Sequence, residues 1–127
     1  MPGFLTDEWF EEVRGLNEAA GDIAINKAMK AVVVNLTVST GGNDVLMCMN
    51  RGFIEKGNAA KADVQMTMPA DYALAIMVRG EWSAGMKGWV KRKIKVNGNM
   101  RKLIPLQVHD PTPDQAELRK KIESITD

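Results

Sequence analysis

The change of hydrophobic period at Pro69 narrows the possible folds of this chain more than any other feature. From Asp63 to Met68, apolar and polar residues alternate, which predicts a strand with one buried face. Residues 70–79 follow directly and are almost entirely apolar, and Pro69 suits the first turn of a helix because its missing N–H is not needed there. A helix with so little polar face must be buried all round or must line an apolar space.

The N-terminal segment shows a helical period instead. Thr6 is expected to cap a helix over residues 7–20, and Gly21 is expected to end it in a left-handed conformation. A second, short helical piece is expected within residues 22–29. The apolar stripe of the first helix recurs at spacings of three and four residues and consists of Leu5, Trp9, Val13, Leu16 and Ala20.

Alternating, valine-rich runs predict strands at residues 30–39, 45–50 and 53–56, joined by turns that contain glycine. Residues 82–88 are expected to form a turn or a short helix. A fifth strand is predicted at residues 90–96, where Val90, Arg92, Ile94 and Val96 alternate with lysines. The order of these elements predicts an α+β domain built on a mostly antiparallel sheet.

Two helical signals close the chain. Asn99 is expected to cap a short helix that starts at Met100, and Pro105 is expected to break or kink that helix. The run Thr112-Pro113-Asp114-Gln115 combines an N-cap, a first-turn proline and a capping-box glutamine. We therefore predict a C-terminal helical extension over residues 112–127, with an apolar stripe formed by Leu118, Ile122 and Ile125.

Composition and the chain ends bound the class of protein. A chain of 127 residues with 45% hydrophobic and 26% charged residues predicts one globular domain, residues 1–127. The formal charge of +1 indicates no global preference for nucleic acid or membrane. The acidic N-terminus is unlike a signal peptide, and the last residues are not a peroxisomal address. Because the single cysteine, Cys48, has no partner for an internal disulfide, we expect a cytoplasmic protein.

The sequence contains none of the common catalytic or cofactor-binding motifs. His109 is the one histidine, and a loop position beside Asp110 suits it better than a role as general base. Cys48 lies in the middle of a predicted strand, where a small buried side chain is the commoner role. The paired carboxylates of the first helix belong to its solvated face. We therefore expect no enzyme activity, no cofactor and no metal.

Charge is unevenly distributed along the chain. Between Trp82 and His109 there is no acidic residue, whereas basic residues are frequent. Three interpretations stay open: a solvated, edge-protecting strand face, a contact with anionic lipid headgroups, or a nucleic-acid surface. Nucleic acid is not expected as a partner, because no pattern of stacking aromatics accompanies the charges. The residues expected at a headgroup or membrane contact are Arg92, Lys91, Lys93, Lys95, Arg101 and Lys102.

Two runs in the second half are similar to a known sequence arrangement. Residues 62–72, Ala-Asp-Val-Gln-Met-Thr-Met-Pro-Ala-Asp-Tyr, lead from an alternating strand into an acidic helix start and an aromatic. Residues 93–100, Lys-Ile-Lys-Val-Asn-Gly-Asn-Met, form a Lys-x-Lys strand that runs into Gly-Asn-Met. Together with the opening Glu8-Trp9-Phe10 helix, they resemble the sterol carrier protein 2 (non-specific lipid transfer protein) family over residues 6–107, and its bacterial, free-standing members in particular.

This resemblance implies a five-stranded sheet covered by helices that enclose an apolar cavity for sterols, fatty acids, phospholipids or acyl-CoA. The nine methionines suit such a cavity because their side chains adapt to varied apolar shapes. Pro105 departs from the helix that the family places there. Arg92 would face the apolar side of its strand, either toward a ligand anion or in a salt bridge. The residues that the resemblance implies as cavity lining are Met66, Met68, Tyr72, Ile76, Met77, Met86, Trp89, Ile94, Met100, Leu103 and Ile104.

Our leading hypothesis is therefore non-catalytic binding or transfer of apolar ligands in an internal cavity. The alternative is an interaction or dimerisation domain of the same fold, filled by its own side chains and accessory to an enzyme system. The helix at residues 112–127 is expected either to cap the cavity or to mediate homodimerisation.

Overall fold

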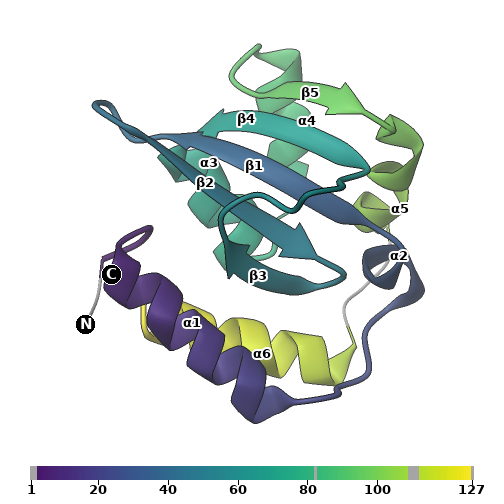
Figure 1. The fold of residues 1–127 in the computed structure, drawn as a ribbon. Helices are drawn as coiled ribbons and strands as arrows, with labels where there is room; N and C mark the ends of the chain where they lie inside the picture. The colour runs from purple at the N-terminus through teal and green to yellow at the C-terminus, as the bar shows by residue number, and fades with distance from the viewer. Residues whose placement is uncertain (1–2, 82, 109–111, 127) are drawn as a thin grey trace.

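The computed structural model describes residues 3–81, 83–108 and 112–126, and its elements follow the predicted order (Figure 1). The strands are β1 (Val33–Ser39), β2 (Asp44–Asn50), β3 (Phe53–Lys56), β4 (Val64–Pro69) and β5 (Lys95–Gly98). The helices are α1 (Asp7–Ala20), α2 (Lys27–Lys30), α3 (Ala70–Ala73), α4 (Ser83–Val90), α5 (Ile104–Val108) and α6 (Pro113–Ser124), with a π-helix η1 (Leu74–Val78) and a 3-10 helix η2 (Met100–Lys102).

The strands form one five-stranded sheet in the order β3-β2-β1-β4-β5. The pairs β1–β2, β2–β3 and β4–β5 are antiparallel, and β1 and β4 are parallel. The predicted α+β class and the mostly antiparallel sheet are therefore confirmed. The parallel pair sits at the centre, because β4 returns to lie beside β1 after the β2–β3 hairpin.

One face of the sheet carries the core. Leu36 of β1 lies opposite Met47 of β2 and Met66 of β4, and all three side chains are buried. The same register places Val34 between Met49 and Val64, so apolar residues form continuous rows across the sheet. Helices α3, η1 and α4 lie behind the sheet in Figure 1, and α1 and α6 run along its lower end.

The opposite face of the sheet is polar and is held by a loop. Asn35 is buried there, and its side-chain amide donates to the carbonyl of Ala59 at 3.0 Å. The N–H of Ala59 donates back to Asn35 Oδ1 at 2.8 Å. These two bonds satisfy both polar ends of the buried amide.

Helix α1 begins as predicted, with Thr6 accepting a hydrogen bond from the N–H of Trp9, and it ends at Gly21, whose φ is +64°. Trp9 is fully buried and makes edge-to-face contacts with Phe4 and Phe10. Its indole N–H donates to Thr126 Oγ1 at 2.8 Å. The first helix is thereby tied to the end of the chain, and α1 and α6 lie side by side (Figure 1).

The strand predicted at residues 90–96 is wrong for residues 90–94, which end a helix and form a turn. Residues 83–90 form α4, and the carbonyl of Gly88 accepts bonds from the N–H groups of Lys93 and Ile94, which close the helix end. Arg92 has a left-handed φ of +61°, so it does not lie on the apolar side of a strand. Only Lys95–Gly98 pairs with β4, because the chain must first leave the helix end before it reaches the sheet edge.

Several other helices and strands begin or end a few residues away from their predicted positions. The short helix expected within residues 22–29 is confined to α2, and β1 begins at Val33 instead of residue 30. The apolar helix after Pro69 opens as α3 and widens into the π-helix η1 before it stops near Gly80. Pro105 does separate two helices, since η2 ends at Lys102 and α5 begins with Pro105 in its first turn.

Candidate ligand-binding site

An apolar cavity of about 50 Å³ lies between the core face of the sheet, η1 and α6. Met49 and Ile54 reach it from β2 and β3, where the strand pairing places them side by side on the core face. Ile76 and Met77 reach it from η1. The full lining is Met29, Met49, Gly52, Ile54, Ile76, Met77, Gly80, Gln115, Leu118, Arg119 and Ile122.

Helix α6 supplies one wall of this cavity. Thr112 and Gln115 form the predicted capping box, which sets the start of the helix. Leu118 and Ile122 follow at one-turn spacings from Gln115, so all three side chains lie on one face and are buried. The C-terminal helix that the sequence predicts as an extension is therefore part of the core, and the hydrogen bond between Trp9 and Thr126 anchors its far end.

Two polar side chains of α6 lie at the cavity. Gln115 is fully engaged, because its carbonyl oxygen accepts from the N–H of Asn26 at 2.7 Å and its amide group contacts Met29 Sδ. Arg119 is half-buried, and its guanidinium lies so close to Gly80 that a Cβ at that glycine would collide with it. Arg119 forms no ion pair with any described residue. The cavity thus has apolar walls and one unpaired cation.

The predicted cavity residues fall into three groups. Ile76 and Met77 line the cavity, whereas Met66, Met68, Ile94 and Leu103 are buried in the surrounding core and Tyr72 packs at its edge. The Met86 side chain lies outside the described part of the structure, as does His109. The structure places three of the predicted residues on the surface instead, namely Trp89, Met100 and Ile104.

The sequence reasoning missed most of the lining. Met29 and Met49 carried only the general signal of high methionine content, and Leu118 and Ile122 appeared as a core stripe without an assigned site. Gln115 was predicted for its capping role alone. The sequence did not identify Arg119 as a site residue. A basic residue on a helix of polar composition cannot be told from one that only aids solubility until its neighbours in the fold are known.

The residues predicted to contact a lipid headgroup differ in their surroundings. Lys91, Arg92, Lys93 and Lys95 are exposed around the end of α4 and the start of β5, and Arg101 is exposed on η2. Lys102 differs, because its ammonium pairs with Asp63 Oδ1 at 2.9 Å and donates to the carbonyl of Ala31. The pKa of the Asp63 carboxyl is held below its usual range, first by its hydrogen bond with Lys102 and then by the hydrogen bond that it accepts from the N–H of Val33.

Among the described residues, the cysteine Cys48 is poorly suited to nucleophilic chemistry. Burial and the nearby Glu55 carboxylate raise the pKa of the Cys48 thiol to about 11, so the thiol is protonated and unreactive at neutral pH. Metal-binding groups of three or more His, Cys, Asp or Glu side chains are absent from the part of the chain that is described. Within the same residues, no helix is both long and apolar enough to cross a bilayer.

A second, wider hollow of about 810 Å³ lies on the surface between α1 and β3. Its floor contains Phe10 and Phe53, but its rim is occupied by charges that pair with each other. Arg14 bridges Glu11 and Glu18, and Lys56 pairs with Asp7 at 2.6 Å. Both hollows are partly open to solvent. The one beneath α6 is the better candidate for an apolar ligand, because its lining is mostly apolar whereas charged side chains line the groove between α1 and β3.

Comparison with solved structures agrees with this architecture. Sterol carrier protein 2 from Yarrowia lipolytica (apo form) is 26% identical, with a TM-score of 0.54 over 82% of this chain and 95% of that chain. A protein from Thermus thermophilus, described as possibly a sterol carrier protein, is 19% identical, with a TM-score of 0.54 over 97% and 90%. Sterol carrier protein 2 like 2 from Aedes aegypti is 17% identical, with a TM-score of 0.51 over 80% and 97%.

No family model matches the sequence, and no curated protein matches it either. The assignment therefore depends on the five-stranded sheet, its one-sided helical cover and the structural likenesses. By these observations, the chain has the sterol carrier protein 2 fold.

Proposed function

We propose that this protein binds apolar ligands without catalysing a reaction, in the space between the sheet, η1 and α6. The observation that carries the proposal is a partly open cavity with mostly apolar walls, at which the Arg119 guanidinium has no ion-pair partner among the described residues. The likeness to the Yarrowia lipolytica sterol carrier protein supports an apolar ligand.

The cavity volume sets a condition on binding. About 50 Å³ is little more than the share of one liquid water molecule, about 30 Å³, and is far too small for an acyl chain. A ligand would therefore enter only when α6 moves away from η1 and the β2–β3 hairpin. Such movement would break the four hydrogen bonds that join residues 112–115 to residues 24–29, as well as the bond between Trp9 and Thr126. It would also expose the buried side chains of Leu118 and Ile122.

Arg119 suggests the class of ligand. Each buried methylene contributes about 0.8 kcal/mol, so an acyl chain would be held mostly by its area. A half-buried guanidinium without an ion pair would add a charge-assisted hydrogen bond to a carboxylate or phosphate, and such bonds contribute about 1.5–3 kcal/mol. We therefore expect an amphiphile with a single anionic head, such as a fatty acid, to bind better than a neutral lipid.

Native mass spectrometry of freshly purified protein, followed by lipid extraction, tests for a bound ligand. The sharper test compares a long-chain fatty acid with the alcohol of the same chain length. Arg119→Gln should weaken fatty-acid binding by about 10- to 100-fold and leave alcohol binding unchanged, as about 1.5–3 kcal/mol implies. Lys120→Gln is the matched control, because Lys120 is the adjacent, exposed cation of the same helix. Equal loss in both variants would refute the role of Arg119.

The small cavity also favours a second candidate, an interaction or dimerisation domain whose interior is filled by its own side chains. The two functions separate in the same experiment. A purified protein that carries no lipid and takes up neither fatty acid nor alcohol would refute the carrier proposal. Analytical ultracentrifugation would then test whether two copies associate.

A further inference from the structure

The end of α4 exposes two adjacent apolar side chains. Trp89 is 47% exposed and Val90 is 70% exposed, which makes Val90 the most exposed of the large hydrophobic residues described. Helix α4 lies at the opposite end of the molecule from α1 and α6 (Figure 1). Exposed large apolar residues that adjoin each other mark a contact surface more often than isolated ones do.

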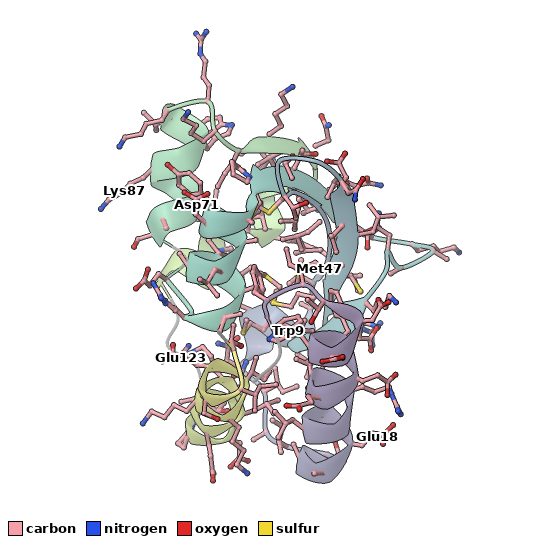
Figure 2. The ribbon with its side chains drawn as sticks, turned by 90° about the vertical axis from the view of Figure 1, so that its left-hand side faces the viewer. Trp9, Glu18, Met47, Asp71, Lys87 and Glu123 are labelled. Carbon is pink, nitrogen blue, oxygen red and sulfur yellow. The ribbon has the colours of Figure 1, made fainter. Side chains whose placement is uncertain are left out.

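Basic residues flank this pair along the chain. Lys87 extends outward from α4 into solvent (Figure 2), and Lys91, Arg92, Lys93 and Lys95 follow it along the chain; all five are exposed. No ion pair links any of them to a described acid. Lys56 and Lys102 elsewhere in the protein do have carboxylate partners. The cations of this surface are therefore available to an external anion.

The backbone holds this surface firmly against the core. Gly88 accepts hydrogen bonds from the N–H groups of Lys93 at 2.7 Å and Ile94 at 3.2 Å, and Arg92 turns the chain with its left-handed φ. Gly88 itself is buried, and any side chain there would collide with Ile94 and Tyr72. A hollow of about 440 Å³ lies beside the turn, lined by Trp89, Arg92, Ile94, Lys95, Val96 and Asn97.

We propose that residues 87–95, which we call the α4 tip, dock the protein on an anionic lipid bilayer. Tryptophan favours the boundary between lipid headgroups and acyl chains, and Val90 would enter beside Trp89. Lys87, Lys91 and Lys93 would contact the headgroup phosphates. A nucleic acid would use the same charges, but it offers no place for Val90, and one exposed aromatic does not make a stacking platform. The bilayer accounts for both the charges and the apolar pair.

Sedimentation with phosphatidylcholine vesicles, with and without phosphatidylserine, tests the proposal. The wild type should bind the anionic vesicles, more weakly at high salt, and should not bind pure phosphatidylcholine. The triple substitution Lys87→Gln, Lys91→Gln and Lys93→Gln should lower affinity on the order of 100-fold, because each cation near an anionic surface contributes roughly fivefold. Trp89→Ala should lower it about 10-fold through lost apolar contact, with the salt dependence retained.

The matched control is Lys27→Gln, Lys30→Gln and Lys120→Gln, which removes the same charge from positions far along the chain from the α4 tip. The control should bind like the wild type, and thermal unfolding should show that each variant is folded. Equal loss in the control would mean that net charge alone drives adsorption, which overturns the proposal. A wild type that ignores anionic vesicles but binds a single-stranded oligonucleotide would overturn it in favour of nucleic acid. Vesicle binding does not depend on ligand uptake, so its result is separate from that of the proposed function.

Discussion

Replacing Leu118 with alanine tests whether α6 seals the interior of the protein. The Leu118 side chain is only 6% exposed and lies at the cavity with Ile122 and Met77. The substitution removes about three methylene equivalents, which costs about 2.4 kcal/mol in lost transfer free energy. If about 50 Å³ of the vacated space stays unfilled, the enlarged cavity adds about 1.2 kcal/mol.

The expected loss in the free energy of unfolding is therefore about 2.4 kcal/mol if the space refills and about 3.6 kcal/mol if it does not, or a drop in Tm of roughly 10 °C for a domain of this size. Urea unfolding monitored by far-ultraviolet circular dichroism measures it. Leu46→Ala is the matched control, because Leu46 is 46% exposed on β2 and its truncation should cost less than about 1 kcal/mol. Equal losses in the two variants would refute the packing of α6 against η1 and the sheet.

Two further predictions follow from perturbed ionisable groups. Because the pKa of Cys48 is raised to about 11, first by burial and then by Glu55, a thiol reagent at pH 8 should modify the folded protein far more slowly than the denatured protein; equal rates would contradict this. The pKa of Asp63 is lower in the folded protein than in the unfolded chain, where it is about 3.9. The pairing of Asp63 with Lys102 therefore stabilises the protein fully at pH values above about 3.9, and this stabilisation is lost as the pH falls through the lower, folded pKa. Lys102→Met should therefore cost less than about 1 kcal/mol at pH 7, since both side chains are partly exposed, and the cost should shrink in acid; a cost independent of pH would contradict the ion pair.

Local signals in the sequence were sufficient for much of the fold. The stripe of Trp9 and Val13, the Thr6 cap and Gly21 together predict α1 with its observed bounds, because caps and helical periodicity act within a few residues. The capping box of Thr112 and Gln115 predicts the start of α6 for the same reason. The alternation from Asp63 to Met68 predicts β4 and identifies its buried face.

Local alternation and family resemblance both gave wrong expectations for residues whose positions depend on contacts distant in the sequence. Val90, Arg92 and Ile94 alternate like a strand, but the hydrogen bonds that Gly88 accepts end a helix there, and only Lys95 onward reaches β4. Trp89 and Met100 were expected in the cavity through family resemblance, and the structure exposes both. Alternation specifies two faces, but pairing with a neighbouring strand decides whether a strand forms at all.

The sequence alone determines the α+β fold class and the order of most helices and strands. It also determines several helix ends and the lack of catalytic motifs, since all of these depend on composition and on short-range spacing. Which side chains meet is settled by the folded arrangement. Gln115 contacts Met29 across 86 residues, and Trp9 donates to Thr126 across 117 residues. The cavity, the position of Arg119 beside Gly80 and the exposed α4 tip all arise from such long-range packing. This packing leaves no periodic pattern in the chain, because its partners are set by three-dimensional proximity and not by separation along the sequence.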